Sequence, residues 1–340
     1  MLPFKIVYSD AYYLPIGQHV FPASKYRLVH DRLLERGIAE PADFVVPEKA
    51  DDRDILLVHG ADWVYKLQTG TLSAREELQM EVPYSEELVE AFWLATGGSI
   101  LAGRYALQDG VGISLGGGFH HAFPDHGEGF CMINDIAVAI RRLQKDNKIE
   151  RALVIDCDVH QGNGTAVIFG RKRALAQSSL AQASQPLPSV GAPSLRSTEH
   201  GSIRELPADG ADVFTISLHQ ENNYPTWKPP SSIDVNLPDG IDDEPYLGWL
   251  DNAVSSALRQ FQPQLISFVA GADPYQEDQL GGLNLTIEGL KRRDEFVFRL
   301  AKTRGIPVMV TLAGGYALDV NDTITIHANT VAAAKEVFGS

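Results

Sequence analysis

The sequence contains only two cysteines, Cys131 and Cys157, which are too few for a disulfide framework. It has no apolar run near the roughly 18 residues that a membrane span requires, and its N-terminus does not read as a secretory signal. Basic residues are also scarce: Lys and Arg number 29 against 44 Asp and Glu, a net charge of −15. These deficits predict a cytoplasmic protein that binds no membrane and, because phosphate backbones repel acidic chains, no nucleic acid.

The remaining composition is that of an ordinary globular chain, with 44% hydrophobic and 21% charged residues over 340 positions. A chain of this length can bury a core without disulfides or metals. We find no repeat and no dividing linker, so we expect one domain over residues 1–340. A segment rich in Ala, Ser, Gln and Pro, at about 171–209, is too polar to pack well. It predicts an inserted surface loop, with a lid or a partner-binding element as the alternative.

Short apolar runs bounded by turn residues predict six buried strands: Lys5–Tyr8, Gly112–Leu115, Ala152–Ile155, Val213–Leu218, Leu265–Ala270 and Val308–Leu312. They lack alternation of apolar and polar residues, which favours strands covered on both faces. Helical patterns lie between them, at Glu87–Leu107, Asp135–Lys145, Tyr246–Phe261 and Ile287–Thr303. This order predicts an α/β fold with a single open, mainly parallel sheet and helices on both faces.

Polar side chains follow five of the predicted strands. They are His120 and His121 in GGGFHHAF, the segment DCDVHQGNG at 156–164, His219, Asp273, and Tyr316 after a Gly-Gly pair. In an open α/β sheet, ligands bind at the carboxyl ends of the strands. The five segments therefore predict one active site at that edge of the sheet.

The central element of this site is Asp156-x-Asp158-x-His160, which we expect to place three ligand-capable side chains on one face of a strand. Two carboxylates and an imidazole are costly to bury without a cation or other partners. Their oxygen and nitrogen atoms suit Zn²⁺ or Fe²⁺, and Asp273 is a natural further ligand. Cys157 points the other way along such a strand and reads as a small core residue.

The sequence at this point resembles the histone deacetylase superfamily, on the arginase/deacetylase fold. The motifs GGGFHHA, GEGFCMIND, VIDCDVHQGNGT, VAGADPY and LAGGYAL occur in the order of that family, and the likeness runs from about Tyr8 to Ala333. The His-Gln-Gly-Asn-Gly segment is similar to the class IV branch, the group of human histone deacetylase 11.

The resemblance implies a zinc-dependent deacylase that removes acetyl or longer acyl groups from lysine side chains. It implies three metal ligands, Asp158, His160 and Asp273, for Zn²⁺ or Fe²⁺. His121 becomes the general base and later acid, with His120 as its electrostatic partner. Tyr316 would donate its hydroxyl to the oxyanion.

The resemblance also implies a narrow tunnel for the acyl-lysine, lined by Gly129 and Phe130, with either Tyr224 or Trp227 on the opposite wall. It implies a structural K⁺ near the active site, with these ligands: Asp156, Asp158, Ser217 and the main chain of His160 and Leu218. Asn163 stands where several classes have an Asp behind the second histidine. Because a missing carboxylate favours neutral imidazole, we expect His121 to titrate lower than beside Asp.

The substrate class is less determined by the sequence. Acetylpolyamine deacetylases of this superfamily use a Glu seven residues after the third metal ligand, where this chain has Leu280. Glu277 and Asp278 are out of register, so acyl-lysine in a protein or peptide is favoured over an acylated polyamine. The remaining alternatives are a ureohydrolase, whose further Asp-rich motifs are absent from the sequence, and a non-catalytic acyl-lysine binding module. The acyl length and the oligomeric state stay open.

Overall fold

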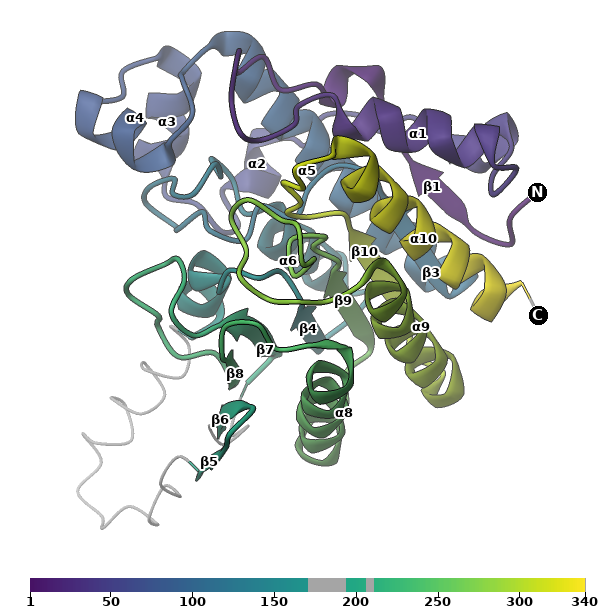
Figure 1. The fold of residues 1–340 in the computed structure, drawn as a ribbon. Coiled ribbons are helices and arrows are strands. Elements are labelled where there is room, and N and C mark those ends of the chain that lie inside the picture. Colours follow the sequence, from purple (N-terminus) through teal and green to yellow (C-terminus); the bar gives the residue numbers. More distant parts are fainter. Residues whose placement is uncertain (171–193, 206–210, 340) are drawn as a thin grey trace.

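The computed structural model describes residues 1–170, 194–205 and 211–339, and its strands form one ten-stranded sheet (Figure 1). The sheet order is β2-β1-β3-β10-β9-β4-β7-β8-β6-β5. The strands are β1 (Lys5–Val7), β2 (Phe44–Val45), β3 (Val111–Ser114), β4 (Ala152–Asp156), β5 (Ser194–Thr198), β6 (Gly201–Glu205), β7 (Val213–Gln220), β8 (Ile233–Leu237), β9 (Leu265–Val269) and β10 (Val308–Thr311). All pairs are parallel except β6 with β8 and β5 with β6. The single open, mainly parallel sheet is confirmed.

Helices cover both faces of this sheet. Helices α5 and α6 pack on one face, while α1, α10, α9 and α8 follow one another across the other (Figure 1). The helices are α1 (Lys25–Glu35), α2 (Asp52–Ile55), α3 (Ala61–Thr69), α4 (Ala74–Met80), α5 (Glu86–Asp109), α6 (Asp135–Lys145), α8 (Asp243–Gln260), α9 (Ile287–Arg304) and α10 (Val320–Phe338), with 3₁₀ turns at Asp10–Tyr12 and Pro41–Asp43. The four helices expected from the sequence are confirmed, and α6 begins as expected after Asn134, whose side chain caps the amide of Ala137. Within the described residues, no helix has the length and apolarity to cross a bilayer.

The expectation that residues 171–209 form a loop is wrong in part. Residues 171–193 and 206–209 lie outside the described residues, but residues 194–205 form the hairpin β5–β6 at the sheet edge. Here β6 pairs antiparallel with β8, Ile203 is buried, and the indole of Trp249 donates to the carbonyl of His200. Because this pairing joins residues some thirty positions apart, local polarity did not reveal it.

Four neighbouring central strands end at the same level of the sheet. Ser114 of β3 pairs with Thr311 of β10, Thr311 pairs with Val269 of β9, and Val269 pairs with Asp156 of β4. The segments that follow these strands therefore leave the sheet side by side, which is the geometry that open α/β folds use to build ligand sites.

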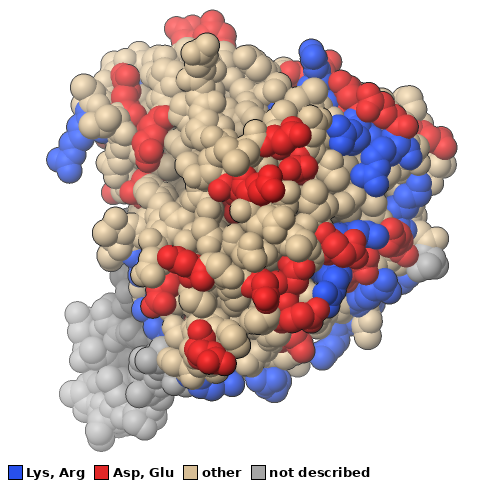
Figure 2. Space-filling model, viewed as in Figure 1, with Lys and Arg blue, Asp and Glu red and all other residues tan. Residues whose placement is uncertain are grey.

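Acidic side chains are scattered over the face of the molecule drawn in Figure 2, while basic side chains gather towards one side. This distribution reflects the excess of Asp and Glu over Lys and Arg. The expected absence of nucleic-acid partners stays a prediction.

Candidate metal centre and active-site pocket

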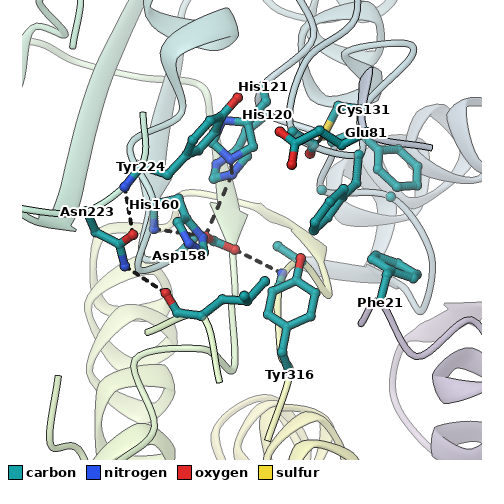
Figure 3. A pocket seen from close by; sticks show the side chains of 18 residues that line it. Phe21, Glu81, His120, His121, Cys131, Asp158, His160, Asn223, Tyr224 and Tyr316 are labelled. Carbon is teal, nitrogen blue, oxygen red and sulfur yellow. Dashed lines mark hydrogen bonds and ion pairs between the residues drawn. The ribbon is translucent and has the colours of Figure 1, made fainter. Parts of the chain in front are cut away.

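A pocket of about 180 Å³ lies at the carboxyl edge of the four central strands. The segments that follow β3, β4 and β10 all contribute to its wall, and Figure 3 shows their side chains converging on it. Its lining includes His120, His121, Asp158, His160 and Tyr316. The structure thus brings most of the site residues expected from the sequence into one place.

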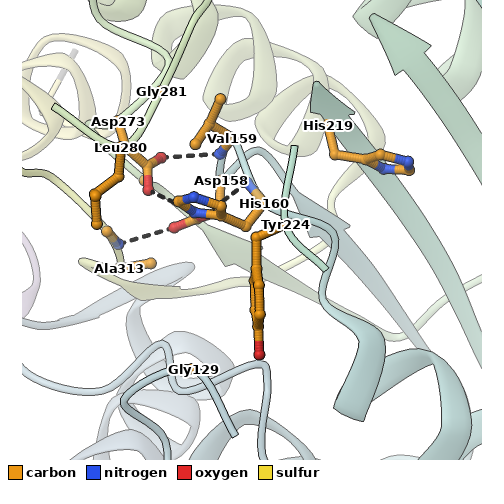
Figure 4. Close-up of polar contacts among 12 residues, drawn as sticks. Gly129, Asp158, Val159, His160, His219, Tyr224, Asp273, Leu280, Gly281 and Ala313 are labelled. Atoms are coloured by element: carbon orange, nitrogen blue, oxygen red, sulfur yellow. Dashed lines mark hydrogen bonds and ion pairs between the residues drawn. The ribbon is translucent and has the colours of Figure 1, made fainter. Parts of the chain in front are cut away.

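Asp158 and His160, which line this pocket, form the candidate metal centre together with the adjacent, buried Asp273 (Figure 4). One ligand atom from each lies within 4.8 Å of the others. Nδ1 of His160 is 3.1 Å from Oδ1 of Asp158 and 3.4 Å from Oδ2 of Asp273. Among the described residues, this is the one cluster of His, Cys, Asp and Glu suited to a metal ion.

The expected arrangement of the Asp156-x-Asp158-x-His160 motif on one strand face is wrong. Strand β4 ends at Asp156, and the next residues turn. The amide of Asp158 donates to Oδ1 of Asp156 (3.2 Å), and the amide of His160 donates to Oδ1 of Asp158 (3.0 Å). The short side chains satisfy the backbone of a tight turn, and this turn, rather than pleating, directs Asp158 and His160 towards Asp273.

The donor set fits a divalent cation. Oδ2 of Asp273 is buried and makes no hydrogen bond among the described residues, although Oδ1 accepts from the amide of Val159 (2.9 Å). Burial and the charge of Asp158 raise the pKa of Asp273 to about 7. Gly314 donates its amide to Oδ2 of Asp158 (2.9 Å), and a Cβ at Gly314 would collide with Oδ2 of Asp273. A buried carboxylate oxygen without a hydrogen bond, next to a glycine that leaves room beside it, is suited to binding a metal ion.

The adjacent histidines His120 and His121 share a hydrogen bond between their Nε2 atoms (3.0 Å). Nδ1 of His120 bonds to Oδ2 of Asp156 (2.8 Å), and Nδ1 of His121 bonds to Oδ1 of Asn163 (2.8 Å). Burial lowers the pKa of His120, but the charges of Asp156 and Asp158 and the hydrogen bond to Asp156 together outweigh burial and raise the pKa to about 9. Burial, together with the charge of His120, holds the pKa of His121 well below its ordinary value. The pair therefore consists of an imidazolium beside a neutral imidazole.

Tyr316 completes the polar wall, with its hydroxyl pointing into the pocket (Figure 3). Its amide donates to Oδ2 of Asp278 (2.6 Å), whose Oδ1 accepts from the amides of Leu280 and Gly281. Gln279 adds two hydrogen bonds to the carbonyl of Tyr316, at 3.1 and 2.8 Å. This role of Asp278 is not visible in the sequence, because only the folded loop turns its carboxylate onto the backbone of Tyr316.

The apolar walls of the pocket are Gly129, Phe130, Leu280 and Tyr224. Gly129 and Phe130 both have positive φ, 51° and 66°, and a Cβ at Gly129 would crowd the ring of His121 at 2.7 Å. Figure 4 shows the ring of Tyr224 running towards Gly129. Trp227 is instead 64% exposed and stacks on Phe123. Of the two residues that the sequence offered for the opposite wall of the tunnel, Tyr224 is therefore the one that lines the pocket.

Two expectations near β7 have different outcomes. The expectation that His219 contributes to the site is wrong. This residue lies within β7, where its ring forms hydrogen bonds with Ser217 and Asn236. The residues expected to bind K⁺, Ser217 and Leu218, are buried in the same strand, and Ser217 pairs with Asp156 across the sheet. The potassium site stays a prediction.

Further pocket residues were missed by the sequence analysis. Phe21, Glu81, Cys131 and Asn223 line the pocket, and Cys131 is a free, buried thiol. Oε2 of Glu128 accepts a hydrogen bond from the Asn163 amide (2.6 Å). The position of Glu128 immediately before the Gly-Phe pair of the tunnel was the one signal available in the sequence.

Comparison with known proteins identifies relatives over almost the whole chain. The histone deacetylase domain family matches residues 19–332. An uncharacterised protein of Picosynechococcus is 35% identical over 98% of this chain and 99% of its own length. Histone deacetylase 2 of Arabidopsis thaliana is 30% identical over 92% of this chain and 74% of its own length. Human histone deacetylase 1 is 27% identical over 90% of this chain, which spans 59% of the human protein.

A solved structure has the same fold. The crystal structure of an HDAC homolog complexed with SAHA superposes with a TM-score of 0.73 at 22% identity, covering 99% of this chain and 84% of the other. The chain belongs to the histone deacetylase family.

Proposed function

We propose that this chain acts as one catalytic domain, a metal-dependent amidohydrolase that removes an acyl group, acetyl or longer, from the lysine side-chain amide of proteins or peptides. Its family membership supports deacetylase activity. The observation that carries the proposal is geometric: His121 lines one pocket with Asp158 and His160 of the metal triad, and the Tyr316 hydroxyl points into the same pocket. Burial also holds the pKa of His121 well below its ordinary value. These groups are a base, a metal centre and an oxyanion donor, the parts that hydrolysis of an amide requires.

Asp158, His160 and Asp273 would hold the metal, and Zn²⁺ is favoured over Fe²⁺ because zinc is the general cofactor of the family. When bound, such an ion polarises the amide carbonyl and lowers the pKa of a water molecule. We also propose a structural K⁺ at Asp156, Asp158, Ser217 and the main chain of His160 and Leu218.

Three side chains of the pocket, His121, His120 and Tyr316, each have a separate role in the reaction. His121 would accept the proton of the attacking water at Nε2, the ring nitrogen that also contacts Nε2 of His120 (3.0 Å), since its Nδ1 is engaged by Asn163. It would later return a proton to the leaving amine. His120, held by Asp156, supplies positive charge next to it. Tyr316 donates its hydroxyl to the developing oxyanion, and the backbone contact with Asp278 fixes its position.

The apolar walls support acyl-lysine over polyamine. Leu280 is half-buried in the pocket wall at the position where polyamine deacetylases have Glu. Glu277 is exposed, and Asp278 is turned to the backbone of Tyr316. The two acidic residues nearest in sequence therefore do not replace the missing carboxylate. Class IV membership stays a prediction carried by the His-Gln-Gly-Asn-Gly segment.

Two other functions have less support. A ureohydrolase would need a second metal, whereas the described residues offer one metal-binding group. A non-catalytic binding module would not need His121 or Tyr316, and both are in place.

The test is a deacylation panel read by mass spectrometry, with an acetyl-lysine peptide, a myristoyl-lysine peptide and N-acetylated polyamines, each with and without a chelator. We expect chelator-sensitive release from one or both lysine peptides. Release from the polyamines alone would transfer the proposal to the small-amine alternative. No release from protein shown to contain metal would overturn it.

A further inference from the structure

Glu128, Asn163 and His121 form a chain of side-chain hydrogen bonds that ends at the proposed base. Oε2 of Glu128 accepts from Nδ2 of Asn163 (2.6 Å), and Oδ1 of Asn163 bonds to Nδ1 of His121 (2.8 Å). Asn163 and His121 are buried, and Glu128 is half-buried, next in sequence to Gly129 of the pocket wall. A carboxylate is thus placed one residue further from the histidine than a direct His–Asp pair would place it.

The two ends of the Asn163 amide differ in chemistry but not in size, so its neighbours decide its orientation. Oε2 of Glu128 acts as an acceptor in this contact, so the NH₂ group of Asn163 must face it. The amide of Gly164 also donates to Oδ1 of Asn163 (3.0 Å). With Oδ1 facing His121, the ring must carry its proton on Nδ1, which leaves Nε2 as an acceptor.

The loop that carries Glu128 is itself fixed. The amide of Glu128 donates to the carbonyl of Cys131 (3.1 Å), and the amide of Cys131 donates back (2.9 Å). Gly129 and Phe130, the tunnel residues, lie between them. The same tight loop therefore shapes the tunnel and presents the carboxylate to Asn163.

We propose that Glu128 is a positioning residue for the hydrolysis: by accepting the Nδ2 proton of Asn163 it locks the amide, and thereby holds His121 as the tautomer with an acceptor Nε2. This inference rests on the proposed function for its kinetic consequence. The alternative role for Glu128 is a general electrostatic effect of its negative charge near the pocket. That effect would change KM for a cationic substrate, whereas the positioning role changes kcat.

The kinetic test compares Glu128→Ala and Glu128→Gln with Asp125→Asn, a change of charge on the same loop at an exposed carboxylate that pairs with His126. We expect Glu128→Ala to lose about tenfold in kcat with KM nearly unchanged, part of the roughly 10²–10⁴-fold that general acid–base catalysis supplies. Glu128→Gln, which can still accept through its carbonyl oxygen, should keep most of the rate. An unchanged kcat in Glu128→Ala, or a loss confined to KM, would overturn the proposal.

A double-mutant cycle tests the contact itself. Asn163→Asp sets a second carboxylate against Glu128, and Glu128→Gln in that background restores a donor for it. The double variant should be faster than Asn163→Asp alone. Effects that simply multiply would mean that Glu128 acts independently of Asn163.

The third readout needs no turnover. Long-range ¹⁵N–¹H spectra of the histidine-labelled, zinc-loaded protein report which ring nitrogen of His121 carries the proton. We expect Nδ1 in the wild type and a mixture in Glu128→Ala. An unchanged tautomer in Glu128→Ala overturns the inference whether or not the protein is a deacylase, while failure of the deacylation panel overturns the function alone.

Discussion

The amide of Gly314 donates a 2.9 Å hydrogen bond to Oδ2 of Asp158, and the missing side chain of this glycine is what leaves room for Asp273. Gly314, which follows β10, thus orients the expected metal ligand Asp158 and makes space for the expected ligand Asp273. The contact joins two segments that are 156 positions apart in the sequence.

Gly314→Ala is therefore expected to weaken metal binding. A Cβ at this position collides with Oδ2 of Asp273, so the carboxylate must move, and changes around metal ligands cost about 10–100-fold in affinity. Competition with a chromophoric chelator measures the zinc affinity. Gly248→Ala in α8 is the matched control, because its Cβ would meet nothing within 4 Å. Wild-type affinity in Gly314→Ala would mean that the triad is not the metal site.

Tyr316→Phe is expected to keep its metal and lose turnover. Removing one oxyanion donor costs about 10²–10³ in kcat, or roughly 3–4 kcal/mol. Metal analysis and steady-state kinetics on an acyl-lysine peptide measure the two quantities together. Tyr275→Phe removes a hydroxyl bonded to Asp322 and should be nearly silent. Full activity in Tyr316→Phe would rule out the oxyanion role.

Asn163→Asp is expected to move the acidic limb of the pH–rate profile. A carboxylate beside Nδ1 favours the imidazolium, so it raises the pKa of His121, which burial now holds well below its ordinary value. The base must be neutral to act, and activity is lost as pH falls through this pKa. The limb should therefore shift to higher pH. An unmoved limb would contradict the assignment of His121 as the base.

The buried His59 is expected to make stability fall in mild acid. Its Nδ1 bonds to the carbonyl of Phe123 (2.9 Å), and its Nε2 accepts from the amide of Asn134 (3.0 Å), so the native fold holds the neutral ring. Burial lowers its pKa from 6.5 to about 4. The stabilisation is complete above pH 6.5 and is lost as pH falls from there towards 4, because the unfolded chain takes up the proton first.

Between pH 7.5 and 5, this histidine alone should remove about 2 kcal/mol from the free energy of unfolding. Urea denaturation at the two pH values measures the loss. His59→Gln can make both contacts without titrating, and it should lose less stability over the same interval. An equal loss in the variant would show that other groups carry the pH dependence.

The fold could be read from the sequence where the strands are buried on both faces, because continuous apolar runs such as Leu265–Val269 need no knowledge of their neighbours. The candidate metal ligands, the histidine pair and Tyr316 could be located because each of them follows such a run. Geometry that depends on contacts made only in the folded chain could not be read. The β5–β6 hairpin needs β8, and the turn at Asp158 needs the side-chain carboxylate of Asp156 as acceptor for the amide of Asp158. The role of Asp278 could not be predicted for the same reason, since only the folded loop brings its carboxylate to the amide of Tyr316.

The most direct test of the account is the turnover of an acetyl- or longer-acyl-lysine peptide measured against the number of zinc ions bound per chain. The account predicts that turnover rises linearly and stops rising at one ion per chain, since Asp158, His160 and Asp273 provide one metal-binding group among the described residues. Turnover that is independent of metal, or that keeps rising to two ions per chain, would contradict it.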